Sequence, residues 1–341
     1  MNEVWSRDKL SADRAVVALK AAAEPTRLRI LALLAKYELT VKDLTHVLGQ
    51  SQPRISRHLK LLGEAGLIDR FREGGWVNLR LAELTAGQGV AGTIVSWLDA
   101  GDDVLRRDAE RARALIEDRA RHAQTFFEAH AGAWDELRAL HMDGSVVEAA
   151  MSEVLGSGPF GTLLDLGTGT GRILELFAPL FERGIGIDTN QSMLSYARSR
   201  IEKVDLRHAQ VRHGDIYNLS LPDGTSNVII MHQVLHFLSE PKRAIAEAAR
   251  VLAPNGRLLI VDFAPHDREA FRERFAHTHL GIPEDRLSDW IAAAGLRVET
   301  TDNVLPAEQA DDGQSQLRVL IWLARKPEQF SPDATHPATD R

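Results

Sequence analysis

Leu163-Leu-Asp-Leu-Gly-Thr-Gly-Thr-Gly171 predicts a buried strand that runs directly into a glycine-rich turn. Glycines at such a turn let the main chain approach a ligand closely and direct its amide groups at the ligand. The spacing G-x-G-x-G differs from the dinucleotide fingerprint, whose third glycine would fall at Arg172. We therefore expect a binding turn for a nucleoside-bearing cofactor that is not a dinucleotide.

Predicted strands and helices alternate through the C-terminal region. The helical segments are Arg172–Phe181, Gln191–Glu202, Lys242–Leu252 and Glu284–Ala294. The strand-like segments are Thr162–Leu166, Gly184–Ile187, Ala209–Val211, Asn227–Met231, Arg257–Phe263, Leu296–Thr300 and Gln316–Ala324. Such alternation is typical of a mostly parallel sheet with helices on both faces, which binds its ligand beyond the carboxyl ends of the strands. We expect an α/β fold with a doubly wound, Rossmann-like sheet of seven strands.

A glycine-rich turn alone is usually only structural, but three features at the ends of later strands favour a ligand. Asp188 ends the second strand, where its carboxylate can accept hydrogen bonds from both hydroxyls of a ribose. Gly214-Asp215-Ile216 follows the third strand, where a carboxylate or an amide can reach an adenine. Met231-His-Gln-Val-Leu-His-Phe237 follows the fourth strand, at the mouth of the same crevice. Together they predict a site for an adenosine-containing cofactor.

A second signature, Leu39–Leu62, predicts a helix-turn-helix near the N-terminus, after helical segments at Ala15–Ala23 and Pro25–Ala35. Gly49 ends the first helix of this motif, and the second helix has Pro53 in its first turn. Apolar residues of the second helix recur at i, i+4 and i+7 and are expected to face the core. These residues are Ile55, Leu59 and Leu62.

Basic and amide side chains cover the other faces of this second helix, as a phosphate-lined groove requires. Arginine suits the edge of guanine, and glutamine suits adenine. The expected DNA contacts in the helix are Gln52, Arg54, Arg57, His58 and Lys60. Two strand-like segments, Leu67–Phe71 and Trp76–Leu81, flank Arg72-Glu-Gly-Gly75 and predict the wing of a winged helix. The arginines placed to grip flanking phosphates are Arg70, Arg72 and Arg80.

The charge of the chain is uneven along its length. Residues 1–80 hold 14 Lys and Arg against 9 Asp and Glu, a net of +5, whereas the remaining 27 basic and 39 acidic residues give −12. A basic head on an acidic body suits contact with a polyanion at one end. No apolar run is long enough to span a bilayer, and Met1–Leu10 is charged unlike a signal peptide, so we expect a cytoplasmic protein. The absence of cysteine removes disulfides, thiolate metal sites and cysteine nucleophiles.

Composition also predicts where the domains meet. Ala86-Gly-Gln-Gly-Val-Ala-Gly92 is glycine-rich, as a domain boundary often is. Asp102–His130 predicts a long helix whose apolar positions form either a dimer seam or part of a solvent-bridging helix. Those positions are Leu105, Ala109, Ala112, Leu115 and Ile116. The expected domains are a winged helix at 10–85, a linker and possible dimerisation helix at 86–125, a cofactor domain at 126–325 and a disordered tail at 326–341.

Residues 10–85 resemble the ArsR family of bacterial winged-helix regulators. The matching stretches are Ala23-Glu-Pro-Thr-Arg-Leu-Arg-Ile-Leu31, Glu38-Leu-Thr-Val-Lys-Asp-Leu44 and Ser51-Gln-Pro-Arg-Ile-Ser-Arg-His-Leu-Lys-Leu-Leu62. The resemblance implies a homodimer whose two recognition helices meet successive major grooves of a palindromic operator DNA. Members that sense soft metals carry cysteines in the second stretch, where this chain has Thr40 and Lys42. No metal site is therefore expected there.

The region from Phe126 to Ala324 resembles the S-adenosylmethionine-dependent methyltransferases of the seven-strand class, especially their quinone-biosynthesis-like branch. The match is strongest at Leu163–Gly171, Asp188, Gly214-Asp215 and Arg250-Val-Leu-Ala-Pro-Asn-Gly-Arg257. The resemblance implies a reversed last strand beside Leu296–Thr300 and an aromatic lid, with Phe126, Phe127 and Trp134 as candidates. The candidate cofactor-binding residues are Asp165, Gly167, Thr168, Gly169, Gly171, Asp188, Thr189, Met193, Gly214, Asp215, Ile216, His232 and Gln233.

Methyl transfer from a sulfonium needs mainly positioning and exclusion of water, so few obligatory catalytic residues are expected. His232 and His236 can each serve as a base near neutral pH, and His232 is preferred because it lies where the fourth strand opens into the crevice. Later histidines, in a region that often covers the substrate, are His266, His277 and His279. Methylation of arsenic relies on cysteine thiolates and is rejected, since the chain has no cysteine.

Two functions are consistent with this pairing of signatures. In the first, a DNA-binding transcriptional regulator also methylates a small molecule with S-adenosylmethionine and releases S-adenosylhomocysteine. In the second, the chain is a repressor that senses S-adenosylmethionine or S-adenosylhomocysteine, with little or no turnover. A third reading, in which one module is vestigial, is weakened by the intact glycine turn, Asp188 and Asp215.

Overall fold

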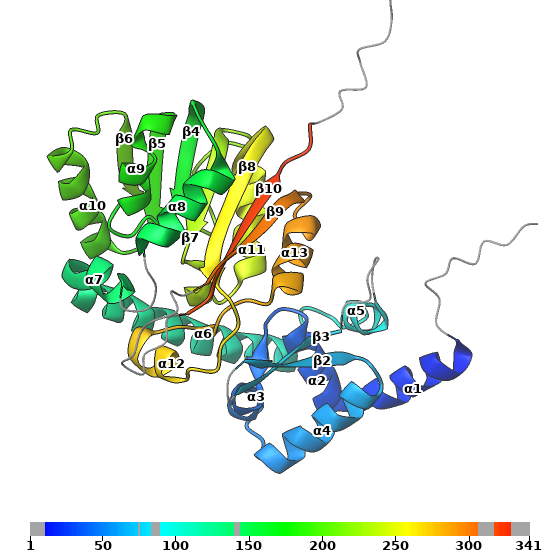
Figure 1. The fold of residues 1–341 in the computed structure, drawn as a ribbon. Helices are drawn as coiled ribbons and strands as arrows, with labels where there is room; N and C mark the ends of the chain where they lie inside the picture. Colours follow the sequence, from blue (N-terminus) through cyan, green and yellow to red (C-terminus); the bar gives the residue numbers. More distant parts are fainter. Residues whose placement is uncertain (1–10, 74–75, 83–88, 140–143, 306–316, 329–341) are drawn as a thin grey trace, which may run out of the picture. The chain divides into compact units, whose positions relative to one another are not determined.

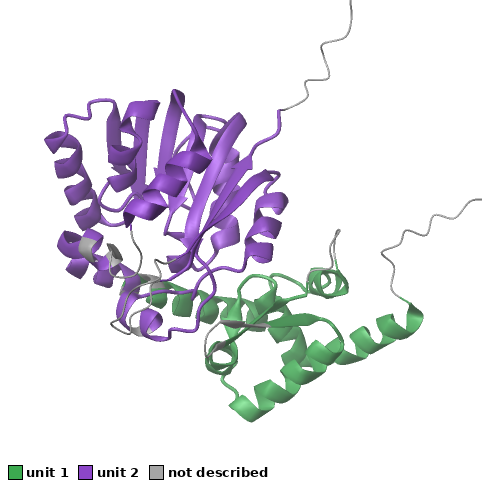
Figure 2. Cartoon of the chain, viewed as in Figure 1, with its two compact units in different colours: residues 1–121 green, residues 122–341 purple. Residues whose placement is uncertain are grey.

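The computed structural model describes residues 11–73, 76–82, 89–139, 144–305 and 317–328 of the chain (Figure 1). The chain folds into two compact units, residues 1–121 and residues 122–341 (Figure 2). One long helix, α6 (Asp103–His130), contains the division between the two units.

The first unit is a winged helix. Its helices are α1 (Ala12–Ala22), α2 (Pro25–Leu34), α3 (Val41–Leu48), α4 (Gln52–Glu64) and α5 (Val90–Ser96). Its antiparallel strands, in the order β1-β3-β2, are β1 (Leu39–Thr40), β3 (Trp76–Leu81) and β2 (Ile68–Glu73). Ile55, Leu59 and Leu62 of α4 are buried in its core, so the expected helix-turn-helix and hairpin are confirmed.

Local hydrogen bonds set the start of α3. The amide of Asp43 donates to the hydroxyl of Thr40 at 3.2 Å, and the amide of Thr40 donates to the carboxylate of Asp43 at 2.9 Å. Gly49, with a φ of 61°, ends the helix in the left-handed conformation. The Asp43 carboxylate also lies 2.5 Å from Nη2 of Arg119 in α6. Asp43 therefore fixes both the first turn of α3 and a contact with α6.

The first part of α6 packs within the first unit. Arg29 of α2 makes a two-pronged ion pair with Asp108, with distances of 2.6 and 2.8 Å. Arg111 donates to the carbonyl oxygen of Val47 at 3.2 Å. Ala112, one of the predicted seam residues, is fully buried in the core of this unit. These contacts give this part of α6 a role inside its own unit.

The expected glycine-rich boundary at residues 86–92 is helical at its end. Helix α5 starts at Val90, and its Ala91 and Ile94 are buried in the core of the first unit. Residues 83–88 lie outside the described part of the chain.

The second unit is an α/β sheet in the order β6-β5-β4-β7-β8-β10-β9, which confirms the expected seven-strand, doubly wound class over the described residues (Figure 1). The strands are β4 (Phe160–Leu166), β5 (Phe181–Asp188), β6 (Ala209–His213), β7 (Ser226–His232), β8 (Leu252–Phe263), β9 (Arg297–Val304) and β10 (Val319–Arg325). Strands β4 to β8 pair in parallel, and β10 runs antiparallel between β8 and β9. The expected reversal of the last strand is thereby confirmed.

Helices cover both faces of this sheet. On one face, α11 (Pro241–Val251) and α13 (Glu284–Ala293) share a core with Leu164. On the other face, α8 (Gly144–Leu155) and α9 (Arg172–Leu176) share a core with Leu163. The two neighbouring leucines enter opposite cores because side chains alternate along a strand. The remaining helices of the unit are α7 (Trp134–Ala139), α10 (Gln191–Lys203) and α12 (Ala270–Phe275).

The helix expected at Arg172–Phe181 is shorter in the structure. Pro179 lies in a 3-10 turn that follows α9, because proline cannot continue an α-helix at an interior position. Phe181 already belongs to β5, which starts three residues before the predicted Gly184. Helices α8 and α12 were not predicted from the sequence.

Lys326, which the sequence placed in a disordered tail, is held at the end of β10. Its Nζ donates hydrogen bonds of 2.7 Å to the carbonyl oxygens of Ala249 and Leu252. Residues 329–341 of the predicted tail lie outside the described part of the chain.

Candidate cofactor site and DNA-binding helix

The turn between β4 and α9 has a backbone that glycine adopts readily. Gly167, Gly169 and Gly171 have φ values of 75°, 50° and 80°. A Cβ atom at Gly167 would lie 2.5 Å from Cγ2 of Val234, so a side chain there would clash. The amide of Gly167 donates to the carbonyl oxygen of Ile187 at 2.8 Å. The turn is therefore held against the end of β5. Thr168 is buried within the turn, and Asp165 is buried near the end of β4.

Asp188, at the end of β5, is joined directly to this turn. Its Oδ2 accepts a hydrogen bond of 2.9 Å from the amide of Gly169, and its Oδ1 accepts one of 2.8 Å from the amide of Asn190. Burial raises the pKa of Asp188. A carboxylate that the main chain fixes in this way has a defined position from which to accept hydrogen bonds from ribose hydroxyls.

The loop after Asp188 is held by the end of α6. Gln124 donates from Nε2 to the hydroxyl of Thr189 at 2.6 Å, and Asn190 donates from Nδ2 to Oε1 of Gln124 at 3.0 Å. The Oδ1 atom of Asn190 accepts from the amide of Met193 at 3.0 Å and so caps α10. The candidates Thr189 and Met193 thus lie in a fixed loop, whereas the contact from Gln124 was not predicted.

Gly214-Asp215-Ile216 lies beside the same strand end. The amide of Gly214 donates to the carbonyl oxygen of Asp188 at 3.0 Å. The Oδ1 atom of Asp215 accepts from the amide of Tyr217 at 2.9 Å, so this side chain turns over its own loop. Ile216 is buried. The structure therefore brings the candidates after β4, β5 and β6 together at the carboxyl edge of the sheet.

Two of the lid candidates lie over this edge. The Nε1 atom of Trp134 in α7 lies 3.8 Å from the position that a Cβ on Gly169 would occupy. The ring centroid of Phe127 lies 5.2 Å from that of Trp134 and 4.8 Å from that of Phe237. Phe126 packs edge-on against Phe275, with ring centroids 6.3 Å apart. These rings form one aromatic cluster between the glycine turn and the segment after β7.

Asp135 ties α7 to the glycine turn. Its Oδ1 accepts a hydrogen bond of 3.0 Å from the hydroxyl of Thr170, and its Oδ2 pairs with Arg200 of α10. Arg200 also donates to the carbonyl oxygen of Thr170 at 3.2 Å. Asp135 carries no local sequence signal, because its partners lie at least 35 positions away along the chain.

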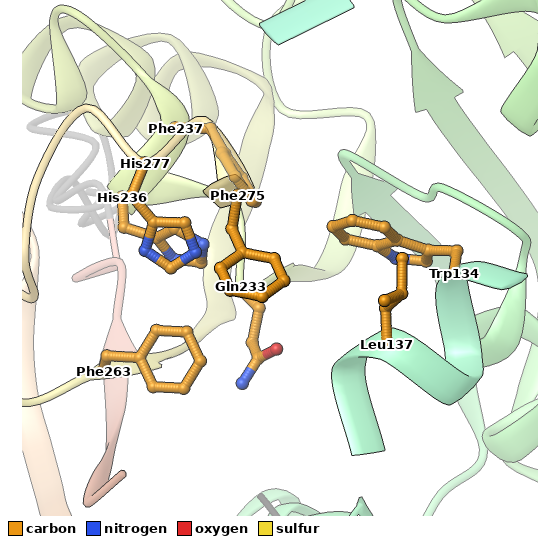
Figure 3. Close-up of a pocket in the computed structure, with 8 residues that line it drawn as sticks. All are labelled: Trp134, Leu137, Gln233, His236, Phe237, Phe263, Phe275 and His277. Carbon is orange, nitrogen blue, oxygen red and sulfur yellow. The ribbon is translucent and has the colours of Figure 1, made fainter. Parts of the chain in front are cut away.

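An aromatic pocket lies between α7 and the carboxyl ends of β7 and β8. Figure 3 shows Trp134 and Leu137 of α7 on one side and Phe263 on the other. The residues that line the pocket are Trp134, Leu137, Gln233, His236, Phe237, Phe263, Phe275 and His277. Gln233, a cofactor candidate, has a φ of 55° and donates from its amide to the carbonyl oxygen of Val261 at 2.7 Å.

His236, the second of the two candidate bases, lies in the wall of this pocket. Its Nδ1 atom is 2.6 Å from Oδ1 of Asp262, and both residues are buried. His232, which the sequence favoured, is buried at the end of β7 and is not among the residues that line the pocket. His277 also lines the pocket, and its ring centroid is 4.2 Å from that of His236. The Nε2 atom of His279 lies 2.9 Å from the carbonyl oxygen of Leu238.

The exposed faces of α4 carry most of the predicted DNA contacts, and His58 is the exception. His58 is only 9% exposed, and its Nδ1 lies 3.6 Å from Oε2 of Glu24. Burial lowers the pKa of His58. His58 follows Ile55 by three positions and precedes Leu62 by four, so the helical period turns it toward the core. The exposed candidates of α4 are Gln52, Arg54, Arg57 and Lys60.

The wing arginines differ in their surroundings. Arg70 is exposed on β2, whereas Nε of Arg80 lies 3.4 Å from the carboxylate of Asp69. The side chain of Arg72 lies outside what the structure describes. Within the described ranges, no helix is long and apolar enough to cross a membrane, and no group of three or more His, Asp and Glu side chains is arranged to hold a metal ion.

This fold and site define a winged-helix protein that carries a methyltransferase domain. Residues 24–70 match the description of bacterial regulatory proteins of the arsR family, and residues 164–260 match that of a methyltransferase domain. The chain is 40% identical over 104 residues to the arsenical resistance operon repressor of Escherichia coli K12, covering 30% of this chain and 81% of that protein. The chain belongs to the arsR family.

Two further relatives concern the methyltransferase domain. The chain is 30% identical over 138 residues to the uncharacterized methyltransferase YcgJ of Bacillus subtilis, which covers 38% of this chain. It spans 33% to 53% of the length of three curated relatives, with YcgJ at 53%. The methyltransferase in the complex with the Haloferax volcanii Trm112 activator has 20% identity and a TM-score of 0.52, covering 61% of this chain and 99% of that chain. This likeness shows the fold alone.

Proposed function

We propose that this protein is a dimeric, DNA-binding transcriptional regulator whose second unit binds S-adenosylmethionine and methylates a small molecule. The observation that supports this function most is the hydrogen bond between the amide of Gly169 and the carboxylate of Asp188. It joins the glycine turn to the strand-end carboxylate, beside a pocket that offers a base and aromatic walls.

The residues present fit this cofactor. Asp188 would hold the ribose hydroxyls, and Gly214-Asp215-Ile216 would lie against the adenine. A Cβ on Gly167 would lie 2.5 Å from Cγ2 of Val234. Glycine is therefore needed for the main chain of the turn to pack this closely against Val234. S-adenosylmethionine would supply an activated methyl group. The remaining candidate contacts come from Asp165, Thr168, Gly169, Gly171, Thr189, Met193, His232 and Gln233.

The chain itself positions the acceptor and excludes water. Phe127, Trp134 and Phe237 form a ring cluster that adjoins Gly169. Asp135 anchors α7 to the turn through Thr170, which keeps the cluster over the site. Fixed placement and a dry site account for much of the rate of a displacement reaction.

In the first unit, the exposed cationic face of α4 would enter the major groove of a palindromic operator. Arg54 and Arg57 suit guanine edges, Gln52 suits adenine, and Lys60 suits a phosphate. Arg70 in the wing would contact the flanking backbone. The family's dimeric state would place one such helix in each half-site.

One observation favours the alternative, in which the second unit senses S-adenosylmethionine or S-adenosylhomocysteine. Helix α6 contributes Asp108 to an ion pair in the first unit and Gln124 to the loop after Asp188 in the second. A cofactor that shifts this loop would therefore act on a helix that belongs to both units.

Two measurements test these functions. Calorimetry with S-adenosylmethionine should show saturable binding by the full-length protein, and its absence would end the cofactor assignment. Operator affinity should then be measured with S-adenosylmethionine, with S-adenosylhomocysteine and with neither. A difference between these conditions supports the sensor, whereas equal affinities together with release of S-adenosylhomocysteine support an enzyme that is only tethered to DNA.

A further inference from the structure

We propose, on the basis of the methyltransferase function above, that the aromatic pocket takes a planar acceptor with a phenolic or enolic hydroxyl. His236 acts as the base that removes the hydroxyl proton, and Asp262 is the residue that positions His236. The acceptor class follows from the chemistry of the pocket wall, and the roles of the two residues follow from their hydrogen bonds.

Asp262 holds the imidazole of His236 in one orientation. Its Oδ1 lies 2.6 Å from Nδ1 of His236 and also accepts from the amide of Phe263 at 2.7 Å. Its Oδ2 accepts from the amides of Leu235 and His236 at 3.0 and 3.3 Å. Since an ionised carboxylate only accepts hydrogen bonds, Nδ1 of His236 carries the proton and Nε2 is the nitrogen that can accept one.

The main chain of His236 is held as firmly as its ring. The amides of Thr278 and His279 both donate to its carbonyl oxygen at 2.9 Å. The hydroxyl of Thr278 donates to the carbonyl oxygen of Phe237 at 3.0 Å. A base that is fixed from both sides is preorganised for a reaction in the adjoining pocket.

The pocket wall selects for a planar, uncharged ring. The rings of Trp134, Phe237, Phe263 and Phe275 line it, and aromatic pairs gain stability in stacked and edge-on arrangements (Figure 3). Of the eight described residues that line this pocket, none is Lys or Arg. An acceptor that carries a carboxylate or a phosphate would therefore lack a cationic partner there.

A base matters only for an acceptor that keeps its proton at neutral pH. A phenol, like the tyrosine side chain, has a pKa of about 10, whereas a thiol near 8.5 is already partly ionised. An amine attacks with its lone pair and loses its proton afterwards. A histidine that an aspartate orients beside an aromatic pocket thus suits a hydroxyl acceptor better than a thiol or an amine.

The step balances without a further reactant. Nε2 of His236 accepts the hydroxyl proton while the acceptor oxygen bonds to the methyl carbon. The carbon–sulfur bond of the sulfonium donor breaks with its electron pair on sulfur, which gives S-adenosylhomocysteine and a methyl ether. His236 then releases the proton to solvent.

The test uses full-length protein, S-adenosylmethionine and pairs of naphthols and flavonols that share a ring system but differ in acidity. The nitro-substituted member of each pair is already ionised at the assay pH. His236→Gln should lower kcat about 100-fold or more on the weakly acidic member and less than about 10-fold on the ionised member, with little change in KM. Asp262→Asn should show the same selectivity, and His208→Gln, at an exposed histidine outside the pocket, should change neither.

Each of the other possible outcomes would overturn one part of the proposal. Equal losses on both members would make His236 a structural residue. Turnover with amines, thiols or carboxylates, but with no hydroxyl, would refute the acceptor class and leave the methyltransferase function in place. Binding of S-adenosylmethionine without turnover on any class would remove that function as well.

The orientation of His236 can be tested without any variant. Nitrogen-15 spectra of the wild-type protein should show His236 protonated at Nδ1. A tautomer protonated at Nε2 would overturn the proposal, even if His236→Gln fails to fold.

Discussion

The amide of Gly169 donates a 2.9 Å hydrogen bond to the carboxylate of Asp188, and this bond joins the turn after β4 to the end of β5. The two residues are 19 positions apart in the chain. Because β4 and β5 are parallel neighbours, their carboxyl ends meet at one edge of the sheet. The candidate cofactor site is therefore a consequence of strand order.

Asp188→Ala should weaken binding of S-adenosylmethionine by about 1.5–3 kcal/mol, roughly 10- to 150-fold, because hydrogen bonds to a charged group are lost. Calorimetry with the folded variant measures this change. Asp289→Ala, at an exposed aspartate of α13, is the matched control and should bind like the wild type. Unchanged affinity in Asp188→Ala would show that this carboxylate does not hold the ribose.

Gly167→Ala should destabilise the second unit by about 1–3 kcal/mol, because its φ of 75° is strained for a residue with a Cβ. The new Cβ would also meet Val234 at 2.5 Å. Urea denaturation measures the loss. The double variant Gly167→Ala/Val234→Ala should relieve the clash but not the backbone strain, so it should recover only part of the loss.

Gly92→Ala is a matched control for that substitution. Gly92 lies in α5, and apart from its chain neighbours and the backbone of its own helix no described atom lies within 4 Å of the position that its Cβ would take. Alanine there should be neutral or stabilise by about 0.5–1 kcal/mol, since glycine is costly inside a helix. A loss of stability in Gly92→Ala as large as that in Gly167→Ala would show that the backbone conformation of Gly167 does not cause the loss there.

Elements with strong local signals could be predicted from the sequence. The glycine turn, the proline-started α4 and the alternation of strands and helices each depend on residues within one short segment. Helix α8 escaped prediction although Val147, Met151 and Leu155 recur at helical spacing and are buried. Val146 on its exposed side is also apolar, so the contrast between its two faces is weak.

Contacts between distant segments could not be predicted in this way. Asp262 meets His236 from 26 positions away, and Gln124 meets Thr189 from 65 positions away. No periodicity marks such pairs, because they depend on which strand ends become neighbours. This is why the sequence pattern favoured His232, the histidine closest to the strand end, whereas His236 lies in the pocket wall.

His266 should make the protein less stable as the pH falls from about 6.5 toward 4. The pKa of His266 is lowered to about 4, mainly by burial, with smaller lowering effects from His236, Arg268 and Arg272 and an opposing effect from Asp267. In the unfolded chain the pKa of His266 is near 6.5, so the unfolded state binds more protons in this range than the native state does. The stability from a neutral His266 is therefore complete above pH 6.5 and decreases on acidification.

Urea denaturation at pH 7 and pH 5 measures this dependence. The full shift corresponds to about 3 kcal/mol, and partial exposure of the side chain reduces the expected effect to about 1–2 kcal/mol. His266→Gln should show a smaller loss between the two pH values than the wild type. The same loss in both proteins would assign the dependence to other groups.

Arg54→Ala should weaken binding to a palindromic operator, selected from random DNA by the wild-type protein, by about 1–3 kcal/mol if the side chain reads a guanine. Arg207→Ala, at an exposed arginine of the second unit, is the control and should bind normally.

His58→Gln should have the opposite effects on affinity and stability, because His58 is buried beside Glu24. It should lower the melting temperature and leave the affinity of the folded protein unchanged. If His58→Gln instead weakens binding as much as Arg54→Ala without loss of stability, His58 faces the DNA and its placement toward the core is wrong.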